Sequence, residues 1–302
     1  MLDAPEDFLG FVTFITGPEK HSGKTTFMNH AARLVRQAVH ARGLRQPALM
    51  TVGYDGESRD YLTGLRKPAV FVQAGDAFVT AERFLRSGGA SPEILDAAPG
   101  ATALGRLCVA RARRDGFVAL VGPDGNSQVD WMLGRIVEGG IADTVFVDGA
   151  INRVTQVAGR AGARLVYALR IDRANLDRSV DRLARMAMLL DLPVESGDVD
   201  YTVTGALTSE AASRLPREAR LVAVEDFTRI FLDRRELSVL LGERRVVVRH
   251  RPDFAGFSVA TRAVDDCAVL EKCRDIPFMG ASLADSLSFN PYEERAAFGG
   301  TL

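Results

Sequence analysis

Gly17-Pro18-Glu19-Lys20-His21-Ser22-Gly23-Lys24-Thr25-Thr26 is the stretch that decides the fold class of this chain. It follows the apolar run of residues 11–15 and precedes residues 25–42, whose apolar side chains recur at helical spacing. A strand, a glycine-bounded loop, Gly-Lys-Thr and a helix form the setting in which phosphate-binding loops occur. Glycines let the backbone curl so that N–H groups point at an anion, and the helix adds the positive end of its dipole. The sequence therefore predicts a loop that holds the phosphates of a nucleotide.

The residue types in this loop suggest individual roles. We expect Lys24 to reach the β- and γ-phosphates and the hydroxyl group of Thr25 to bind Mg²⁺. The spacing differs from G-x-x-x-x-G-K-[ST], because Gly17 lies one residue too far upstream and Ser22 stands before Gly23. A tight strand-to-helix turn without a nucleotide is the alternative interpretation. The residues that we expect to contact the nucleotide are Gly17, Lys20, His21, Ser22, Gly23, Lys24, Thr25 and Thr26.

The composition is that of an ordinary globular protein, and it limits the classes of partner. The 302 residues are 47% hydrophobic and 25% charged, which suits one large domain or two modest ones. A net charge of −1 gives no electrostatic reason to expect nucleic acid or an anionic membrane as the main partner. Apolar runs stay below the ~20 residues of a membrane span, and residues 1–10 lack the basic start of a signal peptide. Three cysteines form no metal-binding pattern and suit a reducing compartment, so we expect a cytoplasmic protein.

Apolar runs alternate with helical patterns from residue 11 to about residue 225. We predict strands at residues 48–52, 144–148 and 163–169, and helices at residues 127–138 and 175–190. This alternation predicts an α/β fold with a doubly wound, mostly parallel sheet. Five charged residues of the last helix are expected to lie largely on its solvated face, namely Arg173, Arg178, Asp181, Arg182 and Arg185.

The predicted domain organisation places the nucleotide-binding domain at residues 1–225. Residues 54–122 are rich in short strand patterns, so we expect a β-rich insertion there or an extension of the sheet. Residues 226–302 are expected to form a small C-terminal α+β extension packed on the core. Within that extension, residues 245–249 and 257–261 are predicted to form a hairpin.

Acidic residues at strand ends are the candidates for holding the metal. Mg²⁺ prefers oxygen ligands, typically one or two carboxylates together with phosphate. Asp148 ends the apolar run of residues 144–147, and Asp55 follows the second predicted strand, close to Glu57. We therefore expect Thr25, Asp148 and Asp55 to bind Mg²⁺, with Lys24, Asp55 and Asp148 as the catalytic residues. For Asp148, the alternative is a carboxylate that caps a turn at the end of a strand. For Asp55, the alternative is a plain glycine-flanked turn.

Further residues are weaker candidates for contacts at the same edge of the sheet. Asp124, in Gly-Pro-Asp-Gly, is a candidate sensor of the γ-phosphate, with a plain turn as the alternative. Lys67 and Arg153 are candidates for phosphate or acceptor contacts, with surface positions as the alternative. The absence of Asn-Lys-x-Asp favours ATP over GTP, and no Ser-His-Asp order or Cys/His metal spacing is present.

These motifs resemble those of the P-loop NTPase superfamily. Residues 17–26 look like a Walker A element and residues 145–148 like a Walker B element. The spacing from Gly17 to Gly23-Lys24-Thr25 is similar to that of dethiobiotin synthetase and its relatives in the SIMIBI-type branch. This likeness covers mainly the first 55 residues and Asp148, so substrate residues of that enzyme cannot be transferred. It implies ATP and Mg²⁺ as cofactors and a homodimer that forms across the nucleotide site.

A second likeness extends through most of the chain. Its short motifs resemble the KamB-type subunit associated with reactivation of lysine aminomutase, and they begin at Gly17, Gly53, Lys67, Asp148, Thr204 and Val224. The resemblance implies ATP-driven rescue of a cobalamin-dependent aminomutase that has lost its intact cofactor. Pro277-Phe278-Met279 departs from it and leaves the C-terminal region without an assigned role.

Taken together, these features predict a Mg²⁺-dependent ATPase that acts as a switch or reactivase on a protein partner. A small-molecule kinase or an ATP-dependent ligase of the dethiobiotin-synthetase type is the alternative, with Asp55 or Lys67 touching the acceptor. A nucleotide-binding scaffold without turnover is the third possibility. The three are distinguished by what stimulates the release of ADP.

Overall fold

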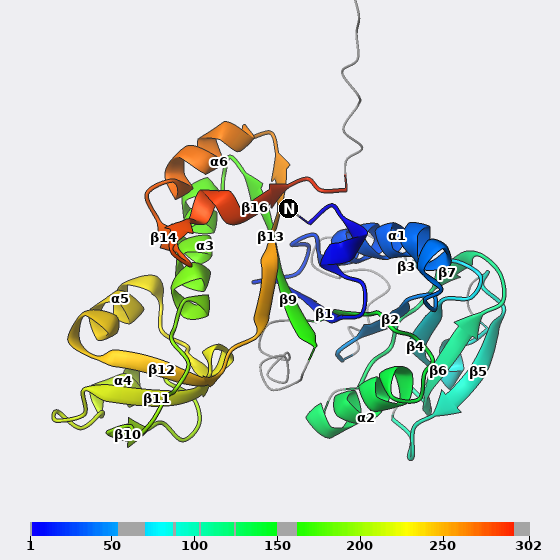
Figure 1. The fold of residues 1–302 in the computed structure, drawn as a ribbon, viewed down its shortest axis with the longest axis horizontal. Helices are drawn as coiled ribbons and strands as arrows, with labels where there is room; N and C mark the ends of the chain where they lie inside the picture. The colour runs from blue at the N-terminus through cyan, green and yellow to red at the C-terminus, as the bar shows by residue number, and fades with distance from the viewer. Residues whose placement is uncertain are drawn as a thin grey trace, which may run out of the picture.

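The computed structural model describes residues 2–53, 70–86, 89–102, 104–123, 125–149 and 162–292. In this part of the chain a nine-stranded sheet has the order β16-β13-β9-β1-β8-β2-β4-β6-β5. Its strands are β1 (Val12–Thr16), β2 (Ala48–Thr51), β4 (Ala77–Ala81), β5 (Pro92–Ala97), β6 (Leu107–Ala112), β8 (Val145–Asp148), β9 (Ala163–Asp172), β13 (Asp253–Arg262) and β16 (Leu287–Phe289). Figure 1 shows this sheet crossing the molecule.

The sheet is parallel except at one edge. Every pairing from β16 through β4 is parallel, whereas β6 and β5 are antiparallel to their neighbours. All five residues of β1 are buried, as expected for a central strand that helices cover on both faces. The predicted α/β class with a large, mostly parallel sheet is confirmed.

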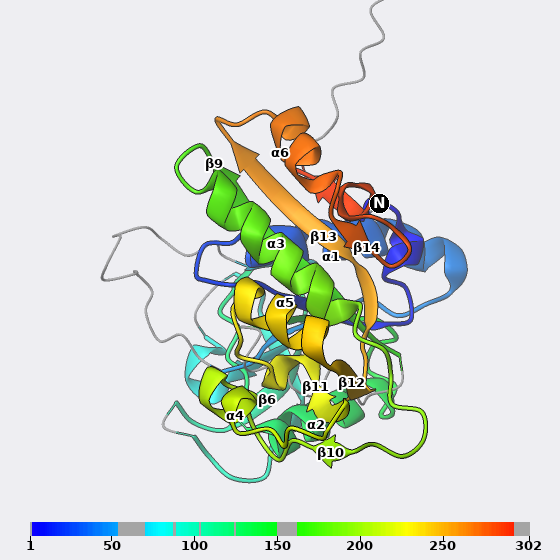
Figure 2. The ribbon, with the colours of Figure 1, turned by 90° about the vertical axis from the view of Figure 1, so that its left-hand side faces the viewer.

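Helices cover both faces of the sheet. On one face lies α1 (Lys24–Arg42), which packs Phe27, Ala31 and Val35 against the sheet and ends at Gly43 in the left-handed conformation. On the other face lie α2 (Asn126–Val137) and α3 (Leu176–Leu190). Figure 2 shows α3 running along β9 and β13. This arrangement is compatible with the doubly wound sheet that the sequence predicts.

A second, smaller sheet lies beyond α3, at the lower left of Figure 1. It consists of parallel strands β10 (Tyr201–Thr202), β11 (Leu221–Asp226) and β12 (Arg245–His250). The helices α4 (Ser209–Ser213) and α5 (Arg234–Glu243) belong to the same region. We call residues 191–250 the small α/β unit.

The predicted domain boundary at residue 225 is wrong, because it falls inside β11. Residues 226–302 are not a separate extension either, since β13 and β16 belong to the nine-stranded sheet. The predicted hairpin of residues 245–249 and 257–261 is also wrong, because β12 and β13 lie in different sheets. The chain leaves the central sheet after β9 and returns to the same strand with β13, a long-range pairing that local periodicity does not reveal.

The strand-rich region after β2 extends the central sheet. Strand β4 pairs with β2, and β6 and β5 follow it outward. Two further strands, β3 (Val70–Val72) and β7 (Gly116–Val118), pair with each other. Of the two interpretations open from the sequence, the described part of residues 54–122 therefore fits an extension of the sheet.

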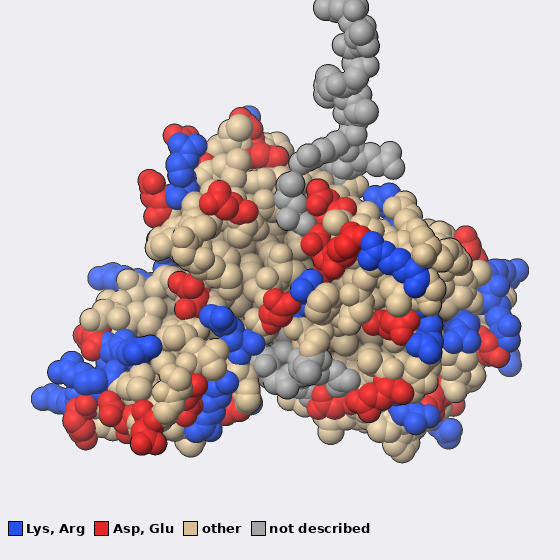
Figure 3. Space-filling model, in the orientation of Figure 1, with Lys and Arg blue, Asp and Glu red and all other residues tan. Residues whose placement is uncertain are grey.

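The remaining elements are short. They are the helix α6 (Asp266–Cys273), the short strands β14 (Pro277–Phe278) and β15 (Ala281–Ser282), and the 3-10 helices at Pro5–Asp7, Glu82–Phe84, Phe227–Arg229 and Leu283–Ser286. Among the described residues, no helix combines the length and the apolar character that crossing a membrane requires. On the face shown in Figure 3, acidic and basic side chains are interspersed.

The burial of the cysteines predicts selective thiol reactivity. Cys267 is exposed, whereas Cys108 and Cys273 are buried. Burial raises the pKa of Cys273 to about 11 and also raises the pKa of Cys108, so both remain thiols near neutral pH. We expect a disulfide reagent such as DTNB to titrate one thiol in the native protein at about pH 8, and all three after denaturation. Rapid native reaction of two or three thiols would contradict this burial pattern.

Candidate functional site

The loop of residues 17–23 joins β1 to α1, and we call it the β1–α1 loop. His21 and Gly23 adopt positive φ angles of 62° and 93°, so the chain turns sharply before the helix begins at Lys24. A Cβ atom at Gly17 would lie 2.5 Å from the carbonyl oxygen of Ala168 and 2.4 Å from the Oγ of Ser22. The loop therefore requires glycine at residue 17, and the predicted order of strand, glycine-bounded loop and helix is confirmed.

The β1–α1 loop lies where the strand order reverses. Strand β1 is flanked by β8 on one side and β9 on the other. From β1 the chain continues through α1 to β2 on one side, whereas from β9 it continues through α3 and the small α/β unit to β13 on the other side. In open parallel sheets, ligands bind at such a reversal, outside the carboxyl ends of the strands.

Thr25 and Asp148 meet across this reversal. The Oγ1 atom of Thr25 donates a hydrogen bond of 2.7 Å to Oδ2 of Asp148. Asp148 ends β8 in register with Ile15 of β1, and its carbonyl oxygen accepts bonds of 2.9 Å from Thr51 Oγ1 and Val52 N. Two oxygen donors of the kind that Mg²⁺ prefers are thereby fixed side by side at the first turn of α1. The predicted metal residues Thr25 and Asp148 are thus brought together by the fold.

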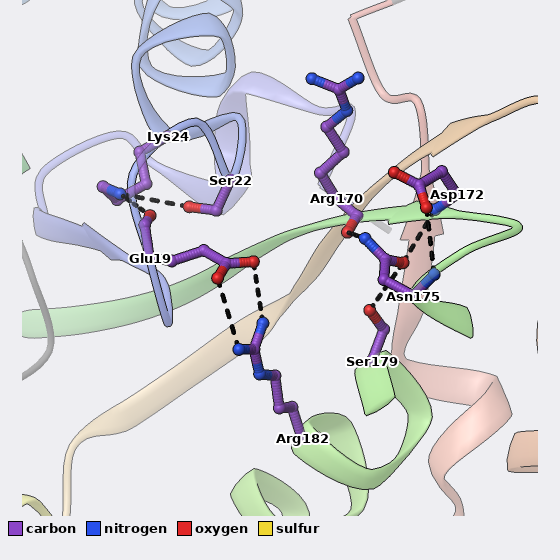
Figure 4. Close-up of polar contacts among 8 residues, drawn as sticks. All are labelled: Glu19, Ser22, Lys24, Arg170, Asp172, Asn175, Ser179 and Arg182. Carbon is purple, nitrogen blue, oxygen red and sulfur yellow. Dashed lines mark hydrogen bonds and ion pairs between the residues drawn. The ribbon is translucent and has the colours of Figure 1, made fainter. Parts of the chain in front are cut away.

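Lys24 folds over the β1–α1 loop. Its Nζ donates hydrogen bonds of 2.9 Å to the carbonyl oxygen of Glu19 and 3.2 Å to the Oγ of Ser22, as Figure 4 shows. Within this loop Ser22 is buried, whereas Lys20 and His21 are exposed. The ammonium group is therefore held at the loop itself, where a phosphate oxygen would compete for the same protons.

The segment that follows β2 contacts the segment that precedes α2. Gly53 N donates a bond of 2.7 Å to the carbonyl oxygen of Pro123. Gly122 lies so close to β2 that a Cβ atom there would be 1.5 Å from the carbonyl oxygen of Thr51. These contacts bring together the segments that precede Asp55 and Asp124. The predicted residues Asp55, Glu57, Lys67, Asp124 and Arg153 themselves lie outside the described residues.

Sequence reasoning missed an ion pair between the β1–α1 loop and α3. Arg182 donates to the carboxylate of Glu19 at 2.8 Å (Figure 4), although its pattern placed it on a solvated face. One turn further along α3, Arg185 donates to the carbonyl oxygens of Ile230 and Leu232 at 2.8 Å and 2.5 Å. Burial lowers the pKa of this guanidinium. The helix thus connects the loop to the small α/β unit, and no local signal in the sequence marks these partners.

The donor set suits a metal that is shared with phosphate. Among the residues described by the structure, no group of three or more His, Cys, Asp or Glu side chains is placed to hold a metal ion. Thr25 and Asp148 provide two oxygens, which suits Mg²⁺ because it usually takes one or two carboxylates and completes its shell with phosphate and water. Comparison of the chain with protein-family models, curated proteins and solved structures found no match.

Proposed function

We propose that the chain binds ATP with Mg²⁺ at residues 17–26 and hydrolyses its γ-phosphate. The hydrogen bond between Thr25 and Asp148 carries this proposal, because it pairs the hydroxyl after Gly-Lys with the carboxylate at the end of the neighbouring strand. A plain strand-to-helix turn gives no reason for these two oxygens to meet. The glycine-dependent loop, the position of Lys24 and the reversal of strand order support the same assignment.

The proposed catalysis consists of positioning and charge stabilisation. The N–H groups of the β1–α1 loop and the start of α1 would bind phosphate oxygens, and Lys24 would exchange its contacts with Glu19 and Ser22 for the β- and γ-phosphates. Thr25 and Asp148 would hold Mg²⁺, which neutralises charge that develops on the phosphates. The attacking water would be oriented from the segment after β2, where Asp55 is our candidate.

We further propose that the ATPase cycle acts on a protein partner. The contacts of Glu19 with Arg182, and of Arg185 with residues 230 and 232, link the loop to the small α/β unit. A phosphate that attracts Lys24 changes the surroundings of Glu19, whose carbonyl oxygen Lys24 now contacts. Such a contiguous network suits a switch that transmits the state of the nucleotide. A cobalamin-dependent aminomutase is the partner that the sequence resemblance suggests.

Asp148→Asn tests the carboxylate of the proposed metal site. We expect the rate of ATP hydrolysis to fall by about 100-fold, because the substitution keeps the shape but removes the charge that holds Mg²⁺. ADP release at saturating ATP and Mg²⁺ measures the effect. Asp143→Asn is the matched control. Asp143 lies just before the start of β8, at the opposite end of the strand from Asp148, and pairs with Arg45. Equal rates in the two variants would contradict the role of Asp148.

The same assay separates the alternatives. ADP release that rises only with a metabolite would favour the kinase or ligase, and tight ATP binding with no ADP after hours would favour the scaffold. Stimulation by an aminomutase would support the switch.

A further inference from the structure

Arg170 lies beside the start of α1, on the same face of the sheet. Its neighbours at alternate positions of β9, Val166 and Ala168, pack in the cluster that contains α1, so Arg170 projects to that face. Arg170 pairs in register with Ala260 of β13, and the Cβ of Ala260 is 3.8 Å from where a Cβ of Gly23 would stand. Figure 4 shows the guanidinium on the side of β9 opposite to Arg182.

The guanidinium of Arg170 is half-buried and lacks a salt bridge to the described residues. Its Nε atom is buried without a hydrogen-bond partner, and among the described residues no acid forms an ion pair with its guanidinium. The adjacent end of α1 carries the positive pole of the helix dipole. Burying part of a cation beside another positive centre is unfavourable unless an anion joins them. The two features together favour an anion between Arg170 and the β1–α1 loop.

The position of Arg170 indicates which part of the nucleotide it meets. Thr25 and Asp148 mark the metal-binding end of the site on the β8 side of β1, whereas Arg170 lies on the β9 side. A nucleotide whose β- and γ-phosphates share the metal at Asp148 would extend its α-phosphate towards β9. We propose that Arg170 binds this α-phosphate through its planar fork of donors. The inference rests on the proposed function, because it needs a nucleotide in the β1–α1 loop.

Arg170→Gln is the direct test. Since ATP and ADP share the α-phosphate, we expect both dissociation constants to rise by the same factor, about 10- to 100-fold. Fluorescent ATP and ADP analogues measure the affinities. Arg173→Gln is the matched control, because Arg173 is an exposed arginine three residues further along. Unchanged affinities in Arg170→Gln, or a dissociation constant that rises for ATP but not for ADP, would overturn the inference.

Protection of the wild-type protein provides a second measurement that does not depend on the variant folding. Saturating ADP should shield Arg170 from phenylglyoxal and leave Arg173 as reactive as before, as read by mass spectrometry of peptides. Equal modification of Arg170 with and without bound ADP would count against the contact. If wild-type protein binds neither ATP nor ADP, the proposed function fails. If it binds both and only the Arg170 results are negative, the inference alone fails.

Discussion

Replacement of Lys24 by alanine is expected to lower the affinity for ATP by about 100-fold, the value of two charge-assisted hydrogen bonds to phosphate. Lys24 Nζ lies within hydrogen-bond distance of Glu19 O and Ser22 Oγ, at the mouth of the β1–α1 loop. Removing the ammonium group leaves the backbone N–H groups of the loop and of α1. These groups attract an anion, but they carry no full positive charge. Hydrolysis should fall further than binding, because Lys24 also stabilises charge in the transition state.

Equilibrium titration with ATP and with ADP measures this effect. Lys272→Ala is the matched control, since Lys272 lies on α6 and pairs with Asp177 at the surface. Its affinity for ATP should equal that of the wild type. If Lys24→Ala also binds ATP as tightly as the wild type does, the nucleotide site is elsewhere and the proposed function loses its basis.

The second large effect concerns stability. Arg36 of α1 and Asp76, in the turn before β4, form an ion pair in which Asp76 is fully buried. The Nε and Nη2 atoms of Arg36 donate to Oδ2 of Asp76 at 2.9 Å and 2.6 Å. We expect Arg36→Met to lower the free energy of unfolding by about 3–5 kcal/mol, because it leaves a buried carboxylate without its cation. Urea denaturation measures this change.

A pH series and two further variants identify the cause of that loss. Burial is the main cause that raises the pKa of Asp76, and Arg36 opposes it, so removing Arg36 raises the pKa further. A raised folded-state pKa stabilises the protein at low pH, so the penalty should shrink as pH falls from about 7 towards 4. Asp76→Asn in the Arg36→Met background should recover part of the stability. Arg33→Met, an exposed neighbour on α1, should change it by less than about 0.5 kcal/mol. A penalty independent of pH would point to lost packing instead.

The proposed switch depends on the ion pair between Glu19 and Arg182. Glu19 and Arg182 are both partly exposed, so their ion pair contributes little to stability. Its role would be to connect parts of the structure. The ion pair joins the β1–α1 loop to α3, and Arg185 joins α3 to the small α/β unit. A partner that binds the small α/β unit is thereby within reach of the nucleotide site through one helix.

The sequence by itself determined the local features. An apolar run, a glycine-bounded turn and helical spacing predicted β1, the loop and α1, because each depends on neighbours within a few residues. The same holds for Asp148 at the end of β8, since the edge of a parallel sheet gathers the carboxyl ends of its strands. Residues 54–69, with Asp55, lie outside the described structure, so that part of the predicted site stays a prediction.

Only the tertiary structure decided which distant segments meet. The pairing of β13 with β9 joins residues separated by the whole small α/β unit, so the local pattern misplaced the domain boundary. The same pairing places Arg170 next to Ala260 and the start of α1, and the packing of α3 places Arg182 against Glu19. Sequence periodicity reports which face of an element is apolar, but not which neighbour covers it, and these polar contacts depend on that neighbour.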